Sequence, residues 1–79
     1  MTTPNSDKDQ ALVEFGSAAR TAREKAGKRL NEFAAEIEIS EYHLRSIETG
    51  RDRASNIVYW KIAVALDLDP TPVLRKAAS

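Results

Sequence analysis

The chain has 79 residues, which leaves room for one domain, because domains commonly run to about 100–150 residues and shorter chains have thin cores. Hydrophobic residues make up 42 % and charged residues 30 % of it, the balance of an ordinary folded protein rather than a disordered or membrane one. The 12 basic and 12 acidic residues give a net charge of zero, which counts against binding nucleic acid by overall charge alone. The absence of cysteine excludes disulfides and thiolate metal sites.

The first residues differ in pattern from the rest. Residues 1–8 contain Pro4, Asn5, Ser6 and alternating charges without apolar spacing, so we expect a flexible tail. This stretch has neither the basic start and apolar run of a signal peptide nor the length of a spanning helix, and the expected location is cytoplasmic. From Asp9 apolar residues recur at helical spacing up to Gly27, which predicts a first helix. They are Leu12, Val13, Phe15, Ala19, Ala22 and Ala26.

Two short helices follow in the pattern. The first runs from near Leu30 to Ile37, with an inward stripe at Phe33, Ala34 and Ile37. Ser40 is suited to cap the next, because its hydroxyl can accept an early backbone N–H. That helix covers about Glu41 to Thr49, with Leu44 and Ile47 inward and Gly50 ending it.

The remaining residues predict one full helix and one short one. Ser55 or Asn56 can cap a helix that runs to about Leu66, and Pro70 or Pro72 can open a last short helix. Alternation typical of strands never persists. The prediction is an all-α domain of five helices over residues 9–77.

The segment FAAEIEISEYHLRSIETG, residues 33–50, carries the functional signal. Two short helices stand three or four residues apart, and a steep crossing through such a turn projects the second helix outward, where it fits the major groove of DNA. An ordinary helical hairpin inside a small bundle has the same spacing. The spacing alone leaves both interpretations open.

Over residues 12–75 the chain resembles the lambda-repressor/Cro-like (XRE-type) family of helix-turn-helix DNA-binding domains. The matching pieces are FGSAARTAREKAG with Arg20 and Arg23, FAAEIEIS, LRSIETGR, and KIAVALDLDPTPVL; the most specific is Ile47, Glu48 and Gly50. Two departures concern DNA binding. Arg29 and Leu30 stand where the family usually has a capping hydroxyl and a phosphate-touching glutamine, and Glu38 replaces the glycine of the turn, so Glu38 must adopt glycine-like geometry or the turn must change.

The resemblance implies a set of DNA-contacting residues. Bases would be contacted by Glu41, Tyr42, Arg45 and Ser46, and phosphates by Lys28, Arg29, His43, Arg51 and Arg53. Arginine can bond to guanine, glutamate can accept from cytosine, and tyrosine can pack on a thymine methyl group, while phosphate contacts set register and salt dependence. Solvated helix and loop surfaces without a ligand remain the alternative, and Glu41 can equally serve the helix dipole. Arg23 and Glu48 match a structural ion pair of the family.

The fourth predicted helix has two apolar sides. Val58, Ile62, Ala65 and Leu66 fall on the core side of a helical wheel, whereas Ile57, Trp60 and Val64 fall nearly opposite. A solvent-facing tryptophan between β-branched residues predicts a homodimer interface or a partner-protein site. Alternatively, the N-terminal tail or the C-terminal RKAAS covers this side.

These patterns predict a sequence-specific double-stranded DNA-binding transcriptional regulator, a repressor, that acts as a dimer. An enzyme is not expected, because His43 is the only histidine and no phosphate loop or carboxylate pair is evident. No metal, cofactor, small-molecule ligand or membrane partner is expected either.

The alternative function is a protein-interaction module of the same fold, which would bind its partner through the Trp60 side. Residues 27–53 support it, because they hold five basic residues (Lys28, Arg29, Arg45, Arg51, Arg53) and six acidic ones (Glu32, Glu36, Glu38, Glu41, Glu48, Asp52), a balance of minus one.

Overall fold

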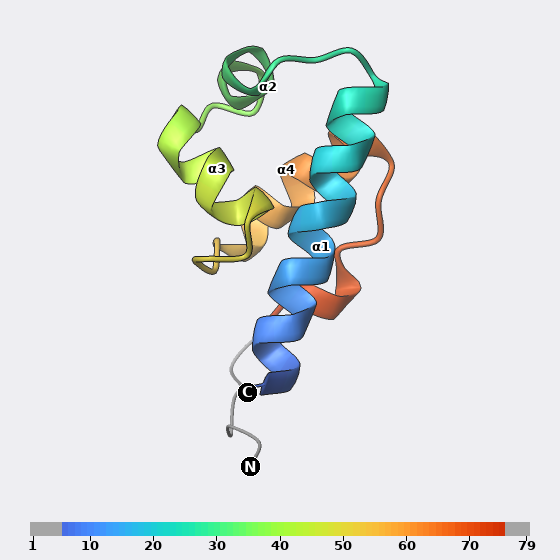
Figure 1. Ribbon diagram of the computed structural model, residues 1–79, viewed down its shortest axis with the longest axis vertical. Coiled ribbons are helices and arrows are strands. Elements are labelled where there is room, and N and C mark those ends of the chain that lie inside the picture. The colour runs from blue at the N-terminus through green and yellow to red at the C-terminus, as the bar shows by residue number, and fades with distance from the viewer. Residues whose placement is uncertain (1–5, 76–79) are drawn as a thin grey trace.

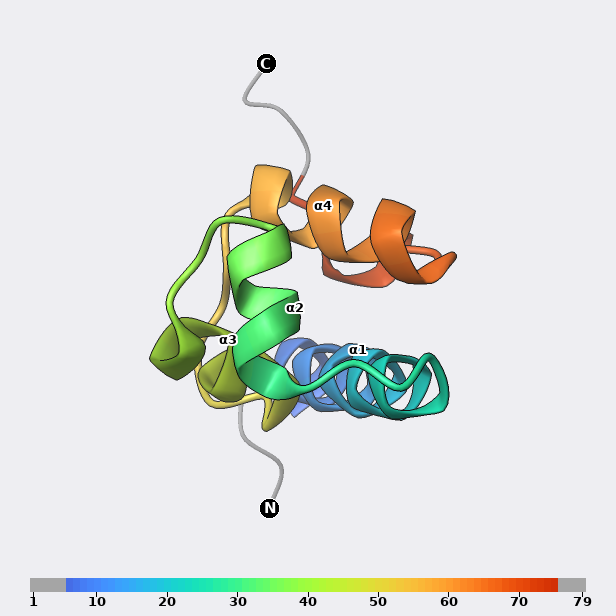
Figure 2. The same cartoon turned by 90° about the horizontal axis from the view of Figure 1, so that it is seen from above.

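The chain folds into four α-helices and a final 3₁₀ turn, in a computed structural model that describes residues 6–75, and their side chains from residue 10 onward. The helices are α1 (Ser6–Lys25), α2 (Leu30–Glu36), α3 (Glu41–Glu48) and α4 (Asn56–Leu66), and the turn is η1 (Thr71–Val73). The long α1 contacts α3, α4 and η1, while α2 packs on α3 (Figure 1). Seen from above, α1 and α4 lie on opposite sides of the molecule (Figure 2).

Two expectations about the ends of the chain need correction. The first helix begins at Ser6 rather than Asp9, since no proline or glycine interrupts the chain between these two residues; residues 1–5 of the expected tail lie outside the described residues. The expected fifth helix is the single 3₁₀ turn η1, which has Pro72 near its start and ends where Leu74 returns to extended geometry with a ψ of 142°. Residues 76–77 of the expected domain also lie outside the described part.

The helix ends inside the chain follow the predicted chemistry. Ser40 Oγ accepts from the His43 amide at 3.0 Å, and Ser55 Oγ accepts from the Val58 amide at 3.3 Å, so both serines are N-caps. Gly27 and Gly50 end α1 and α3 with φ of 73° and 72°, the left-handed geometry that glycine adopts freely. The short connections between α1, α2, α3 and α4 are therefore specified locally.

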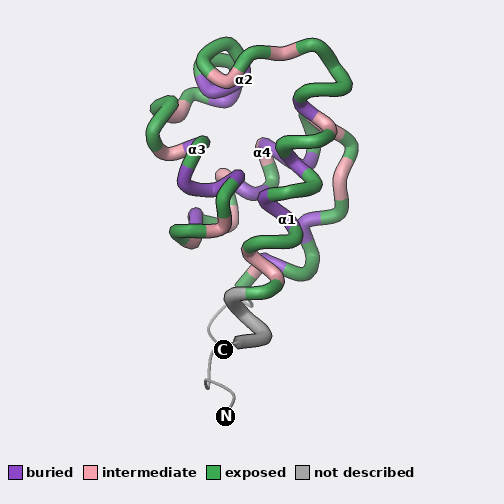
Figure 3. Tube along the Cα trace, in the orientation of Figure 1, coloured by how far each residue is buried: buried purple, intermediate pink, exposed green. Residues whose placement is uncertain are grey.

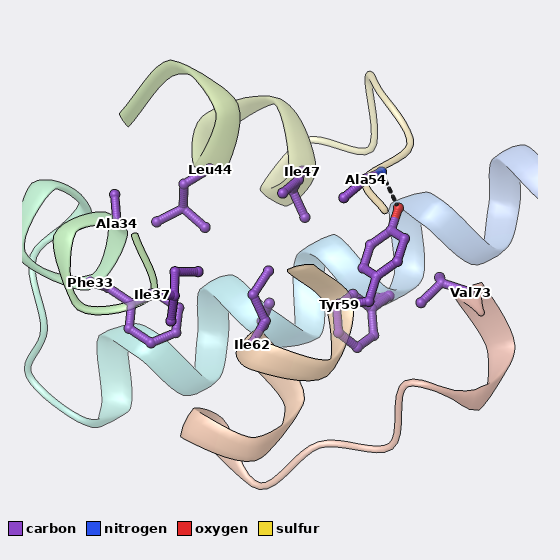
Figure 4. Close-up of a cluster of buried hydrophobic side chains, with 11 residues drawn as sticks. Phe33, Ala34, Ile37, Leu44, Ile47, Ala54, Tyr59, Ile62 and Val73 are labelled. Atoms are coloured by element: carbon purple, nitrogen blue, oxygen red, sulfur yellow. Dashed lines mark hydrogen bonds between the residues drawn. The ribbon is translucent and has the colours of Figure 1, made fainter. Parts of the chain in front are cut away.

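The core lies between α1, α3 and α4, closed at one end by α2 (Figure 4). The inward residues predicted on α2 and α3, which are Phe33, Ala34, Ile37, Leu44 and Ile47, are all buried. Tyr59, which the wheel did not assign to the core, is buried at its centre: its ring meets Phe15 edge-on at 5.4 Å, and its hydroxyl accepts from the Ala54 amide at 3.0 Å. Ala65, expected inward, is exposed, because Tyr59, Ile62 and Ala63 define the packed side of α4.

Within residues 6–75 no helix is long and apolar enough to cross a membrane.

Candidate nucleic-acid interface

The turn between α2 and α3 keeps the helix-turn-helix geometry without a glycine. Glu38 has a φ of 63°, so of the two alternatives stated for this position it takes the left-handed, glycine-like conformation. The Glu38 amide donates to Ala35 O at 3.1 Å and the Ile39 amide to Ala34 O at 2.9 Å, which closes the end of α2. Lys61 of α4 donates to Ile37 O at 3.3 Å and approaches the Glu38 carboxylate at 3.6 Å. The turn is thus held by α4 despite its strained residue.

Helix α3 has one packed side and one exposed side (Figure 3). Glu41, Tyr42 and Arg45 are exposed, with Tyr42 at 67 %, as the predicted base-contacting role requires. Ser46 is the exception among the four predicted residues, because it is buried at 3 % exposure. Its backbone carbonyl accepts from the Arg51 amide at 2.9 Å, so the chain after α3 folds back next to it. Ser46 is therefore removed from the candidate base-contacting set.

The predicted phosphate-contacting residues divide into two groups. Arg29 and Arg51 are exposed and form no ion pair with a described side chain. Lys28 Nζ instead donates to both Glu36 carboxylate oxygens, at 2.9 and 3.0 Å, and lies 5.4 Å from the Phe33 ring centroid. These contacts occupy Lys28 within the fold.

The other two residues are also partly engaged. Arg53 Nη1 donates to Val73 O at 2.6 Å and so ties the loop after α3 to η1. His43 is half-buried, and its backbone amide serves the Ser40 cap. Among the predicted DNA-contacting arginines, Arg29, Arg45 and Arg51 are exposed and form no ion pair with a described side chain.

A buried ion pair anchors the end of α3 on α1. Arg23 donates from Nε to Glu48 Oε2 at 2.6 Å and from Nη2 to Glu48 Oε1 at 3.0 Å, and its Nη1 donates to Lys28 O at 2.8 Å. The hydrogen bond with Glu48 raises the pKa of the Arg23 guanidinium, against the opposing effect of burial. Such a bidentate pair fixes orientation more than it adds stability. The structural role expected for these two residues matches this geometry.

A groove of about 270 Å³ runs between α1 and α3, beside the exposed side of α3. It is lined by Arg20, Arg23, Leu30, Arg45, Glu48 and Thr49. Sequence reasoning assigned no contact to Arg20 or Thr49. The signal was available in the helical spacing, because Arg20 precedes Arg23 by three residues and Thr49 follows Arg45 by four, so each pair shares a helix face.

The outer side of α4 is exposed, as the wheel predicted. Ile57, Trp60 and Val64 are 69, 51 and 74 % exposed. They line a hollow of about 490 Å³ next to the α2–α3 turn, together with Glu36, Ile37, Glu38, Lys61 and Ala65. The segments considered as alternative covers for this side, residues 1–5 and the end of RKAAS, lie outside the described residues.

The described side chains contain no group of three or more His, Cys, Asp or Glu residues placed to hold a metal ion.

The comparisons with known proteins agree with this geometry. A family model described as a helix-turn-helix domain matches residues 14–76. The solved structure of the restriction-modification controller protein C.AhdI from Aeromonas hydrophila is similar, with a TM-score of 0.68 and 27 % sequence identity over 78 % of this chain and 94 % of that one. The comparison with curated proteins found no match.

Proposed function

Because this chain belongs to the helix-turn-helix family, we propose that it is a sequence-specific double-stranded DNA-binding regulator, acting as a repressor, with α3 in the major groove and two copies on one operator. The observation that carries the proposal is the free outer side of α3, where Arg45 has no ion-pair partner among the described side chains and Glu41 and Tyr42 lie exposed beside it. The controller role named for the similar solved structure supports a regulatory task.

The side chains on this surface can form specific contacts with base edges and further contacts with the flanking phosphates. Arg45 can donate two hydrogen bonds to guanine O6 and N7, Glu41 can accept from a cytosine amino group, and Tyr42 can pack on a thymine methyl. Arg51 just after α3 and Arg29 just before α2 can then bind the flanking phosphates. Under this proposal the contacts depend on these individual arginines, since the net charge of zero supplies no overall attraction to DNA.

The proposed dimer uses the outer side of α4. In a twofold interface the same surface meets itself, so it must be self-complementary. The hollow around Trp60 suits this requirement, because Ile57, Trp60 and Val64 make it apolar and its lining includes both a carboxylate, Glu38, and the ammonium group of Lys61. Two domains joined in this way read two half-sites, which restores the affinity and specificity that one small domain lacks.

The DNA-binding proposal is tested by selecting bound sequences from random duplexes and then measuring affinity at two salt concentrations. We expect binding that falls steeply with salt, since each phosphate contact releases counterions. Arg45→Ala should weaken binding to the selected duplex about 10- to 100-fold and relax the preference at one base pair. Lys25→Ala is the matched control, because Lys25 is an exposed basic residue at the end of α1, about 200° around the helix from Arg23.

A protein-interaction module is the second candidate, favoured by the exposed Trp60 side and the balance of minus one over residues 27–53. It predicts no enrichment of any duplex and no effect of Arg45→Ala. Trp60→Ala would instead abolish binding of the partner protein. The selection experiment therefore separates the two functions.

A further inference from the structure

We infer that the groove between α1 and α3 is a phosphate-binding subsite, in which Arg20 binds one phosphodiester of the DNA backbone while Arg45, which contacts the base, adds its positive charge to the groove. The inference rests on the proposed DNA binding and adds to it a residue of α1 that lies outside the helix-turn-helix segment. The two arginines are 25 positions apart in the chain, but both line this groove of about 270 Å³.

The charges in the groove favour an anion. Its lining contains three arginines and one carboxylate, and that carboxylate, Glu48, is fully engaged by Arg23 at 2.6 and 3.0 Å. The charges of Arg20 and Arg45 are therefore not neutralised by any other residue that lines the groove. Two like charges that share a groove repel each other, and an anion between them removes that repulsion.

Arg20 is available, because its present partner is weak. It pairs with Glu24 one helical turn away, at 3.3 Å, and the two side chains are 61 and 55 % exposed. An exposed pair at this spacing contributes only a few tenths of a kcal/mol, because water screens it and both side chains lose freedom. A phosphate offers the guanidinium a bidentate, charge-assisted contact, which is stronger. Arg20 can thus exchange Glu24 for a DNA phosphate.

The other residues of the groove supply no competing donor. Leu30 at the start of α2 is apolar, and the Thr49 hydroxyl donates to the backbone carbonyls of Arg45 and Ser46, at 2.9 and 3.2 Å. Arg20 is therefore the side chain that binds the phosphate, and Arg45 contributes positive charge. Arg45 belongs to both the groove and the exposed side of α3. In this proposal, a DNA strand whose base contacts Arg45 therefore has its sugar-phosphate backbone next to the groove.

The test uses the full-length protein and the duplex selected with the wild type. Arg20→Ala should weaken binding about 10-fold for selected and unrelated duplexes alike, and lower the slope of log affinity against log salt by about 1. Glu24→Gln, which frees Arg20, should strengthen binding about 2-fold. Arg20→Lys should keep the salt slope and lose part of the affinity, because lysine keeps the charge without the bidentate fork.

Lys25→Ala provides the control for removing a positive charge from α1, and it should change the salt slope by much less than Arg20→Ala. Thermal melting of each variant establishes that it folds. If the wild type binds but Arg20→Ala binds as tightly and with the same slope, the subsite is wrong and the proposed function stands. If the wild type binds no duplex, the proposed function itself is wrong.

Discussion

Residue 38 holds a glutamate in a backbone conformation that glycine adopts without cost. Its φ of 63° places Cβ close to a carbonyl oxygen, a strain of about 1–2 kcal/mol for a residue with a side chain. Glu38→Gly removes this strain. It also stabilises the unfolded state by about 0.4–1 kcal/mol, because glycine gives the unfolded chain more conformational entropy. We expect a net gain of about 0.5–1 kcal/mol in the free energy of unfolding, measured by urea denaturation.

The side-chain charge of Glu38 must be separated from its backbone strain. The carboxylate lies 3.6 Å from Lys61 Nζ and is largely exposed, so this pair contributes little. Glu38→Gln retains the strain and removes the charge, and its unfolding free energy should stay within about 0.5 kcal/mol of the wild type. Equal stabilisation by Gln and Gly would show that charge, not strain, sets the stability at this position.

The contrast between Glu38 and Ser46 shows what the sequence can predict for single residues. For Glu38 the family resemblance left two alternatives, glycine-like geometry or a changed turn, and the φ of 63° corresponds to the first. The burial of Ser46 was not predictable, because on the helical wheel it lies between exposed Arg45 and buried Ile47. Its burial depends on which neighbouring elements cover that side of α3 in the tertiary structure, and helical spacing alone does not specify them.

Among the elements, α1 and α3 are in close backbone contact at Gly16. A Cβ built there would lie 2.2 Å from Ile47 O and 2.7 Å from Glu48 O, both of them backbone atoms. Gly16→Ala should therefore lower the free energy of unfolding by about 2–3 kcal/mol, although alanine is the better helix former, because the backbone cannot yield without moving α3. Thermal or urea denaturation measures this loss.

Ser17→Ala is the control on the same helix. Ser17 is exposed, so the change to alanine should leave stability equal or slightly higher. If Gly16→Ala is as stable as this control, the close packing of α1 on α3 is wrong. The result also bears on DNA binding, because the groove between Arg20 and Arg45 is formed by these same two helices.

The elements themselves were largely predictable because their signals are local. The Ser40 and Ser55 caps, the Gly27 and Gly50 ends and the inward residues of α2 and α3 all follow from short-range hydrogen bonding and helical spacing. The groove between α1 and α3 was not predictable, because it depends on which helix faces meet in the tertiary structure. The place of Tyr59 at the centre of the core was missed for the same reason.

For the whole molecule the open question is what meets the outer side of α4. Trp60 lies between Ile57 and Val64, all at least half exposed, and removing this surface from water would stabilise an association. Buried tryptophans at interfaces commonly contribute about 2 kcal/mol or more. We therefore expect the wild type to sediment as a dimer at micromolar concentrations, and Trp60→Ala to raise the dimer dissociation constant at least about 10-fold.

Tyr42→Ala, measured without DNA, is the matched control for this prediction, because Tyr42 is also an exposed aromatic residue but belongs to α3 and does not line the hollow on α4. It should leave the dimer unchanged.

In DNA binding, the two substitutions should affect different duplexes. Trp60→Ala should reduce affinity for a duplex with two half-sites far more than for one with a single half-site, because it removes the link between the two domains. Tyr42→Ala should reduce both affinities, because each half-site loses its own contact. Wild type and Trp60→Ala that sediment as identical monomers at high micromolar concentration would exclude the dimer and leave the α4 surface to a different partner.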